Sequence, residues 1–361
     1  MSDKLTIQEK MKLLKEVGEE IIEESELRKL LSEEKNLIAY DGFEPSGRIH
    51  IAQGLLRAIN INKVTKTGIK FKMLVADWHG WANNKMGGDL EKIQEVGKYF
   101  IEVWKASGMN LGNVEFVWAS DLLNNREYWK TVMQIARNTT INRILRCGQI
   151  MGRKEGEIQQ ASQIIYPCMQ AADIFHLGAK ITQLGMDQRK VNVLAREIGE
   201  KIGFWKPVII SHHMLMGLTP PKSNAEGVEK SIEQKMSKSN PASSIFMTDT
   251  EKEVNEKFRK AYCPEGQVKD NPVLEYCKYI IFEKVEEFVI EREEKFGGKI
   301  SFKSYSELEK AFRKKEIHPL DLKRAAAKYI NEFLEPVREH FRKNKNAQHL
   351  LKKVEGFKIT R

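Results

Sequence analysis

Short apolar runs alternate with long helical patterns through the first two thirds of this chain. Strands are predicted at residues 37–40, 69–76, 114–118, 181–184 and 207–210. Helices are predicted between them, among others at residues 51–67, 90–107 and 188–202. Strands that alternate with helices of about ten or more residues are typical of a parallel sheet with helices on both faces. The alternation therefore predicts an α/β fold with a doubly wound, Rossmann-like parallel sheet.

Three stretches depart from this alternation. Residues 5–34 carry apolar positions at helical spacing and predict one or two amphipathic helices. Residues 124–178 contain no convincing strand, so a helical insertion is expected between the two halves of the sheet. Residues 217–243 are rich in Pro, Ser, Asn, Lys and Gly, which predicts a long mobile loop.

The last third of the chain is predicted to be helical, with loops at residues 263–271 and 296–302. A length of 361 residues suits two domains. We therefore expect N-terminal helices over 1–35, the α/β domain over 36–245 and an all-α domain over 246–361.

Composition excludes several classes of protein. Hydrophobic residues make up 41% of the chain, which is enough for a core and excludes wholesale disorder. No apolar run approaches the roughly 18 residues of a membrane span, and the polar N-terminus lacks a secretory signal. The four cysteines lie far apart, without a CxxC pair, so neither a disulfide framework nor a zinc site is expected. These features favour a cytoplasmic protein.

The net charge of +10 is unevenly distributed. Residues 305–361 contain 15 Lys and Arg against 8 Asp and Glu, an excess of 15 − 8 = +7. A basic tail of this kind indicates contact with a polyanion, most often a nucleic acid. The alternative is a solvated helix surface with no partner.

The segment at residues 40–53 could bind a phosphate group. A Pro/Gly turn joins the first predicted strand to a helix that is expected to open at His50, with Gln53 on the same face of its first turn. A helix N-terminus offers free N–H groups and a partial positive charge. Taken alone, the two side chains favour the simpler interpretation that they cap or decorate the helix.

A second segment lies in the predicted mobile loop and reads Lys235-Met236-Ser237-Lys238-Ser239. Two lysines on a flexible loop can close over a polyphosphate and stabilise charge as it develops there. Taken alone, this is also an ordinary soluble loop. The two segments together resemble the two signatures of class I aminoacyl-tRNA synthetases. The second is a full match, whereas Ala52 and Gln53 depart from the usual last two residues of the first.

A polar stripe narrows the resemblance. Tyr166, Gln170 and Asp173 are spaced at i, i+4 and i+7, on one face of a helix. Residues 184–190 follow the next predicted strand, where open α/β sheets bind their ligands. With residues 40–47, and with 261–264, 295–298 and 318–321 further on, these segments resemble tyrosyl-tRNA synthetases of the archaeal and eukaryotic type.

This resemblance implies a tyrosine–tRNA ligase, which makes tyrosyl-adenylate from L-tyrosine and ATP and transfers the tyrosyl group to the 3′ end of tRNA(Tyr). The residues implied to bind tyrosine are Tyr40, Leu74, His79, Tyr166, Gln170, Asp173 and Gln188. Those implied to bind ATP are His50, Gln53, Asp187, Lys235, Met236, Ser237, Lys238 and Ser239. Among these, the catalytic ones are His50, Gln53, Lys235 and Lys238.

The resemblance also implies partners. The acceptor end of tRNA would meet Arg143, Arg146, Arg189 and Lys190, and the anticodon would meet Phe296, His318 and Asp321. Mg²⁺ would accompany ATP without a resident metal site, and a homodimer would form through the insertion. For Asp321 and Phe296 the alternative is structural: an Asp that caps a helix and a Phe that packs under it. For Leu74 the alternative is plain core.

Two other functions stay open. A tryptophanyl-tRNA synthetase shares the architecture, but an indole N–H needs one acceptor rather than the pair Tyr40 and Asp173. A non-catalytic tRNA-binding paralogue would need neither the lysine loop nor the polar stripe. Residues 223–234 look like an extra insertion ahead of the lysine loop, and the sequence does not explain their role.

Overall fold

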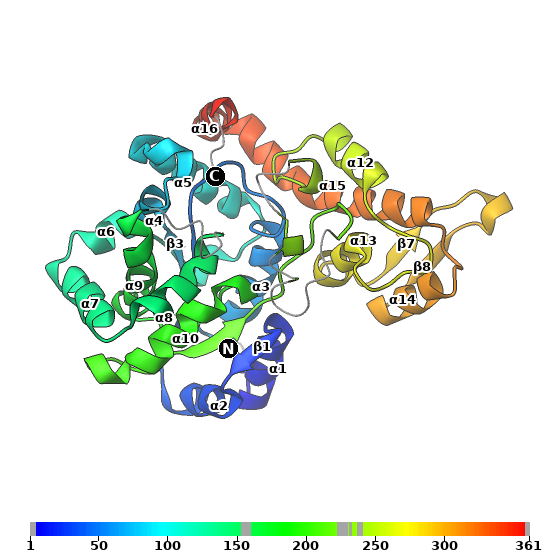
Figure 1. Cartoon of the computed structure of the whole chain (residues 1–361). Helices are drawn as coiled ribbons and strands as arrows, with labels where there is room; N and C mark the ends of the chain where they lie inside the picture. The colour runs from blue at the N-terminus through cyan, green and yellow to red at the C-terminus, as the bar shows by residue number, and fades with distance from the viewer. Residues whose placement is uncertain (1–4, 153–159, 222–229, 231–232, 237–240, 358–361) are drawn as a thin grey trace.

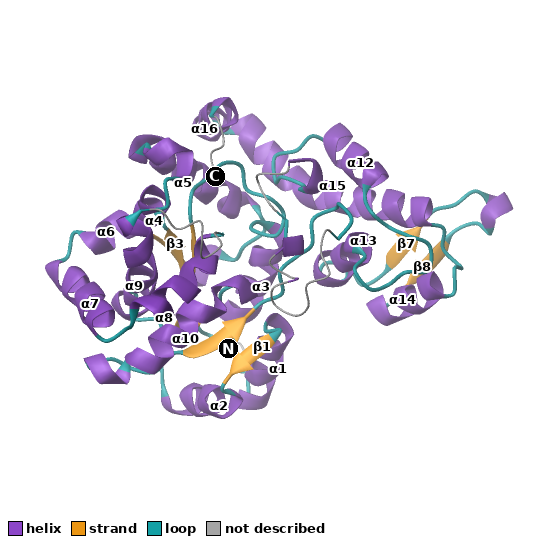
Figure 2. Cartoon of the chain, in the orientation of Figure 1, coloured by secondary structure: helices purple, strands orange, loops and turns teal. Residues whose placement is uncertain are grey.

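The computed structural model describes residues 5–152, 160–221, 230, 233–236 and 241–357. A sheet of six strands forms its centre (Figure 2). The strands are β1 (Glu20–Ile22), β2 (Ile38–Phe43), β3 (Lys70–Val75), β4 (Val114–Trp118), β5 (Ile181–Thr182) and β6 (Val208–Ser211). Their order is β1-β6-β5-β2-β3-β4, and every neighbouring pair is parallel except β1 with β6. The parallel sheet and its five predicted strands are thus confirmed.

The order of the strands places the site. From β2 the chain moves outward through β3 to β4, then returns to the other side of β2 for β5 and β6. In such sheets a crevice opens at the carboxyl ends of the two strands where the order reverses. These are β2 and β5, so the residues after Phe43 and after Thr182 are expected to border the crevice.

The helices of the first two thirds lie around this sheet (Figure 1). They are α1 (Ile7–Val17), α2 (Glu24–Glu33), α3 (Leu55–Lys66), α4 (Asp77–Ala82), α5 (Leu90–Ala106), α6 (Ala119–Leu123), α7 (Arg126–Arg137), α8 (Ile141–Arg146), α9 (Ala161–His176) and α10 (Arg189–Ile198). Short helical turns are η1 (Lys85–Gly88), η2 (Leu111–Asn113), η3 (Cys147–Met151), η5 (Met186–Gln188) and η6 (Glu200–Ile202). Between residues 124 and 178 the described part of the chain has helices and no strand, as predicted.

Two predictions in this region were wrong in detail. The N-terminal segment is not purely helical, because β1 adds an antiparallel edge strand to the sheet. Helix α3 begins at Leu55 rather than at His50. His50 is instead held in a bridge with Phe246, and residues 51–54 form a turn. The backbone must leave that bridge before it can coil, and at Gly54 it passes so close to Met247 that a side chain there would collide with it.

The last third contains α12 (Glu251–Lys260), α13 (Pro272–Tyr276), α14 (Tyr305–Arg313), α15 (Pro319–Lys343) and α16 (Lys345–Gly356), with the turns η7 (Pro241–Ser243), η8 (Cys277–Ile281) and η9 (Glu294–Phe296). The predicted helical region is confirmed with one departure, because β7 (Phe288–Ile290) pairs antiparallel with β8 (Ile300–Phe302). Phe288, Ile290 and Phe302 are buried. Three-residue strands are too short to show a period of two in the sequence.

The C-terminal helices return to the α/β region. In Figure 1, α16 lies beside α5. Lys353 contacts Glu95 at 2.9 Å, and His340 contacts Glu102 at 2.7 Å. One apolar cluster runs through both regions. The two regions thus pack closely against each other, and the division near residue 245 stays a prediction from the sequence. None of the described helices is long and apolar enough to cross a membrane.

His213 joins three parts of the chain. Its Nδ1 lies 3.2 Å from Glu19 and its Nε2 lies 3.2 Å from Glu275 in α13, while its ring stacks on Tyr279. Burial by itself would lower the pKa of His213, but the hydrogen bonds and charges of the two glutamates outweigh it and raise the pKa to about 9. The charged ring therefore stabilises the fold.

This raised pKa predicts a pH-dependent stability. The contribution is complete below the ordinary histidine pKa of about 6.5, and it is lost as pH rises through the folded-state pKa of about 9. His213→Gln should lower the free energy of unfolding by about 2 kcal/mol at pH 6 and by much less at pH 9.5. Urea denaturation measures this, with the exposed His349→Gln as control. If the difference in free energy of unfolding between the wild type and His213→Gln does not change with pH, the ion-pair assignment is contradicted.

Candidate active site

Asp173 lies fully buried in α9. Its Oδ1 accepts a hydrogen bond from the Tyr128 hydroxyl at 2.7 Å, and its Oδ2 lies 2.9 Å from His79 Nε2. Tyr128 comes from α7, and His79 comes from α4, which follows β3 directly. Three elements far apart in the sequence thus meet at one carboxylate.

Tyr40, in the middle of β2, lies near this carboxylate. The Tyr40 side chain is buried, with Gln170 next to it, but its hydroxyl group makes no hydrogen bond of good geometry with the described residues. Burial, together with the charge of Asp173, raises the pKa of Tyr40 and of Tyr128 well above the ordinary value. Both phenols therefore stay neutral and can donate or accept. A buried hydroxyl next to a buried carboxylate is a site for one further polar group.

His79 also belongs to this pocket. Burial by itself would lower its pKa, but the charge and the hydrogen bond of Asp173 outweigh burial and raise it. The His79 ring lies edge-on to Tyr166, with the ring centroids 5.2 Å apart. Leu74 in β3 is buried in the same apolar cluster as Tyr40 and Tyr166. The pocket thus has a polar end and apolar walls.

A second group of polar side chains contains amides and a carboxylate. Gln170 Nε2 donates to Gln188 Oε1 at 2.9 Å, and Gln188 Nε2 donates to the carbonyl oxygen of Ile150 at 3.1 Å. Burial, together with the charge of Glu44, raises the pKa of Tyr166 well above its ordinary value. Glu44 in turn accepts from Asn83 Nδ2 at 3.0 Å. Such a mixture suits an ammonium group and a carboxylate.

Two of these side chains were not predicted from the sequence to belong to the site. Glu44 follows β2 in the same turn segment as His50, and its place after a strand end was an available signal. Tyr128 lies inside an amphipathic helix of the insertion, where nothing in the local pattern separates it from core.

The predicted nucleotide residues are brought together in part. Lys235 Nζ lies 2.6 Å from Asp187 Oδ2, although 48 residues separate them. Lys235 also pairs with Met216 in a bridge, and Met236 is buried. His50 is buried beside Phe246, and the Gln53 carbonyl accepts from the Trp104 indole at 2.9 Å. Ser237, Lys238 and Ser239 lie outside the described residues.

The predicted acceptor-end residues lie on two adjacent helices. Arg143 and Arg146 belong to α8, and Arg189 and Lys190 begin α10. Arg143 pairs with Glu197 of α10 at 3.0 Å, and Arg189 pairs with Glu20 at 2.6 Å. Burial raises the pKa of the Cys147 thiol, and the charges of Arg143, Lys190 and Arg146 oppose this shift.

The predicted anticodon residues lie on the surface of the C-terminal region. Phe296 in η9 is 59% exposed, so it does not pack under the helix. The cap of α15 is made by His318, whose ring nitrogen accepts from the Leu320 N–H at 3.2 Å. Asp321 lies in the first turn of α15 and makes no capping hydrogen bond within the described chain. The structural alternative for Phe296 and Asp321 is therefore wrong.

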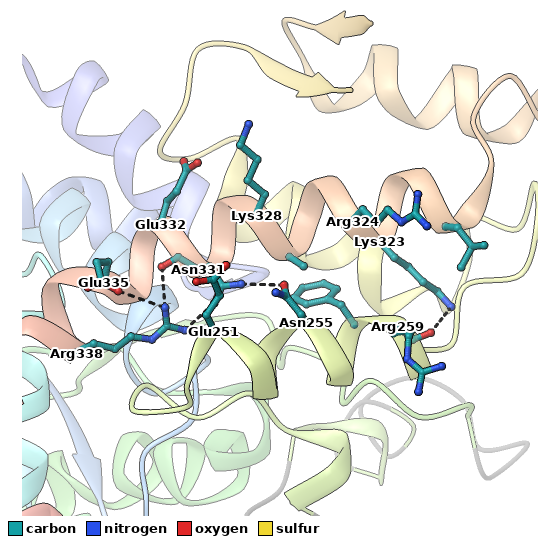
Figure 3. Close-up of a pocket in the computed structure, with 13 residues that line it drawn as sticks. Glu251, Asn255, Arg259, Lys323, Arg324, Lys328, Asn331, Glu332, Glu335 and Arg338 are labelled. Atoms are coloured by element: carbon teal, nitrogen blue, oxygen red, sulfur yellow. Dashed lines mark hydrogen bonds and ion pairs between the residues drawn. The ribbon is translucent and has the colours of Figure 1, made fainter. Parts of the chain in front are cut away.

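A cavity of about 1080 Å³ lies near these residues, between α12 and α15 (Figure 3). Both helices line it with charged side chains, and Leu320 stands at its edge. Asn331 donates to Asn255 at 3.0 Å across it, and Lys323 donates to the carbonyl oxygen of Arg259 at 3.4 Å. The cavity is thus a feature of the C-terminal region and no part of the crevice at β2 and β5.

Known proteins are similar to this chain in sequence and in fold. The family model described as tRNA synthetases class I (W and Y) matches residues 32–335. Tyrosine–tRNA ligase 1, cytoplasmic, of Arabidopsis thaliana is 51% identical over 358 residues, covering 98% of this chain and 90% of the relative.

Two solved structures agree with this match. Tyrosyl-tRNA synthetase of Pyrococcus horikoshii, complexed with L-tyrosine, is 40% identical with a TM-score of 0.90, over 96% of this chain and all of that one (100%). The Leishmania major enzyme with tyrosinol is 44% identical with a TM-score of 0.89, over 98% of this chain and 61% of that one. The chain therefore belongs to the class I tRNA synthetases and, within them, to the tyrosine–tRNA ligase family.

Proposed function

We propose that this chain is a tyrosine–tRNA ligase. It activates L-tyrosine with ATP to give tyrosyl-adenylate and pyrophosphate, and then transfers the tyrosyl group to the 3′-terminal ribose of tRNA(Tyr). The observation that carries the proposal is the buried Asp173 carboxylate beside the buried Tyr40 hydroxyl. Together they offer an acceptor and a donor to one phenol, at the end of a pocket with apolar walls.

The first step needs positioning and charge stabilisation. The tyrosine carboxylate attacks the α-phosphorus of ATP in line, the new P–O bond forms, and pyrophosphate leaves with its electron pair. Gln170, Gln188 and Tyr166 hold the amino-acid end of the substrate. Asp187 meets the ribose, and Lys235, now its partner at 2.6 Å, turns to the departing pyrophosphate.

His50 and Gln53 are assigned to the phosphates, and Met236 to the nucleotide, with Ser237, Lys238 and Ser239 completing the loop. Mg²⁺ belongs to the nucleotide substrate, because it is usually bound through phosphate oxygens and water. The Arabidopsis relative is named as cytoplasmic, and the four cysteines of this chain are free and buried. Both facts support a cytoplasmic location.

The test is ATP–pyrophosphate exchange with single amino acids. Tyrosine should support exchange, and tryptophan and phenylalanine should not. Exchange with tryptophan in place of tyrosine would favour the tryptophanyl alternative, which the relatives at 51% and 44% identity do not support. If none of the amino acids supports exchange, the result would favour the non-catalytic paralogue.

We also propose a homodimer through the helical insertion. Exposed large apolar side chains gather there, namely Trp129, Met133, Ile141, Ile164 and Ile165. A surface of this kind, on the side of the molecule away from the C-terminal region (Figure 1), suits a second copy of the chain. Sedimentation of the purified chain tests this, and a monomer at micromolar concentration would contradict it.

The acceptor end of tRNA is assigned to Arg143, Arg146, Arg189 and Lys190, and the anticodon to Phe296, His318 and Asp321. An exposed aromatic ring can stack on an unpaired base, and a carboxylate can accept from the Watson–Crick edge of guanine. Stacking on one base is worth roughly 1–3 kcal/mol.

Phe296→Ala or Asp321→Ala should therefore raise the KM for tRNA about tenfold and leave ATP–pyrophosphate exchange unchanged. Exchange does not involve tRNA, so it separates binding from folding. Leu111→Ala, another exposed apolar residue, is the control and should change neither quantity. A variant with lower thermal stability and lower exchange activity would overturn the anticodon assignment.

A further inference from the structure

Arg57 is fully buried in α3, yet its guanidinium group reaches residues that lie in, or directly after, three different strands. Its Nε lies 3.0 Å from Oδ2 of Asp41 in β2. One terminal nitrogen donates to Nδ1 of His212, directly after β6, at 3.2 Å. The other donates to the carbonyl oxygen of Gln183, directly after β5, at 3.4 Å. The planar donors of one arginine therefore tie β2, β5 and β6 together.

The hydrogen bonds determine the protonation state of His212. Arg57 and the amide nitrogen of Gln183 can only donate, and both reach Nδ1, at 3.2 and 3.1 Å. Nδ1 is therefore the acceptor, and the ring proton sits on Nε2. Burial and the charge of Arg57 lower the pKa of His212 well below its ordinary value, so the ring is neutral.

The same strand ends carry groups of the active site. Tyr40 directly precedes Asp41 in β2. His212 holds the loop after β5, because its N–H donates to the Leu184 carbonyl at 2.9 Å and its carbonyl accepts from the Met186 N–H at 3.1 Å. That loop leads directly into Asp187 and Gln188. Arg57 thus links the strand of Tyr40 to the loop of Asp187.

We propose that Arg57 is a positioning residue for adenylate formation, which fixes the phenol-binding end of β2 relative to the loop that carries Asp187 and Gln188. This rests on the proposed function. In-line attack requires the tyrosine carboxylate and the ATP α-phosphate to be aligned, and a displacement of about 1 Å can lower the rate by roughly 10²-fold. Arg57 acts through Asp41 and His212 and does not itself contact substrate.

A purely structural role would be to neutralise Asp41. Burial, opposed by the charge of Arg57, raises the pKa of Asp41 to about 7, so the carboxylate does depend on its partner. Two of the three acceptors of Arg57 are uncharged, however, namely the His212 ring and the Gln183 carbonyl. Neutralising a carboxylate needs neither of them, whereas holding three strand ends needs all three.

The experiment separates these roles with two variants. Arg57→Met leaves Asp41 buried and unpaired, so it should lower both the thermal midpoint and the kcat of tyrosine-dependent exchange. Arg57→Met combined with Asp41→Asn removes the buried charge. Replacing a buried ion pair by neutral groups is often tolerated, so the midpoint should recover. The kcat should stay about 10–100-fold low, since the link between strands is still missing.

Recovery of both the midpoint and kcat in the double variant would overturn the proposal. If the double variant does not fold, Arg57→Lys decides, because it keeps the charge but cannot bridge three acceptors. The Arg57→Lys variant should keep the wild-type thermal midpoint but show a lower kcat of tyrosine-dependent exchange. A wild-type kcat in this variant would overturn the proposal.

Arg196→Met is the matched control. Arg196 is also a buried arginine that pairs with a glutamate, Glu26 at 2.8 Å, and donates to the carbonyl of Pro207 at 2.7 Å, but it joins no group of the site. Its loss should lower the midpoint and leave kcat unchanged. A wild-type chain without tyrosine-dependent exchange would instead contradict the proposed function itself, so the two failures are distinguishable.

Discussion

Replacing Lys235 by alanine should lower the rate of tyrosyl-adenylate formation by about 10²–10³-fold and leave the affinity for tyrosine nearly unchanged. In the structure Lys235 contacts Asp187 at 2.6 Å, on the nucleotide side of the site. The pocket around Asp173 lies on other elements. A cation that acts on charge formed only in the transition state changes kcat without changing ground-state binding. We expect the same result for Lys238→Ala.

Pre-steady-state adenylate formation and equilibrium dialysis with tyrosine measure the two quantities separately. Lys230→Ala is the matched control, because Lys230 belongs to the same segment but pairs with Asp270 at 2.8 Å. It should leave the rate of adenylate formation unchanged. If Lys235→Ala weakens tyrosine binding as much as it lowers the rate of adenylate formation, the lysine belongs to the amino-acid pocket and not to the nucleotide side of the site.

Replacing Asp173 by asparagine should lower kcat/KM for tyrosine by about 10–100-fold and narrow the preference for tyrosine over phenylalanine. The variant keeps the shape of the side chain but removes the charge that His79 and Tyr128 contact at 2.9 and 2.7 Å. Hydrogen bonds to charged groups are worth roughly 1.5–3 kcal/mol each. Phenylalanine has no hydroxyl group to bind the Asp173 carboxylate, so its activation should fall less than that of tyrosine.

Exchange assays with both amino acids measure this preference, and thermal unfolding controls for damage to the fold. Tyr40→Phe, which removes only the second partner of the phenol, should give a smaller change in the same direction, by roughly 0.5–1.5 kcal/mol. The pocket assignment is wrong if both variants discriminate between tyrosine and phenylalanine as well as the wild type does.

Local pattern was a good guide to the large elements. The strands β2 to β6 each contain apolar residues between polar turns, although Asp41, Lys72 and Glu115 interrupt the pattern. Central strands of a parallel sheet favour such apolar residues because helices cover both of their faces. The helices α5 and α10 show the period of a helix with one buried face. The short strands β7 and β8 and the edge strand β1 were missed, because three residues carry no period that separates a strand from a loop.

In the site, too, the residues within one helix were predicted, whereas contacts between different elements were not. Tyr166, Gln170 and Asp173 were predicted together because the spacing of one helix places them on one face. Tyr128 was not predicted to join them, although it lies 2.7 Å from Asp173, because that contact depends on how α7 packs on α9. The buried link from Arg57 to Asp41 and His212 was missed for the same reason.

The sequence by itself determined the parallel α/β architecture, the helical insertion, and the two segments that identify the family, because each depends on residues close together in the chain. Only the tertiary structure decided that His50 is held against Phe246, that Lys235 meets Asp187, and that one arginine connects three strand ends. Apart from the pair of Arg57 and Asp41, these contacts join residues from about 50 to nearly 200 positions apart. They depend on register and on packing at a scale of a few ångströms, which no periodicity along the chain records.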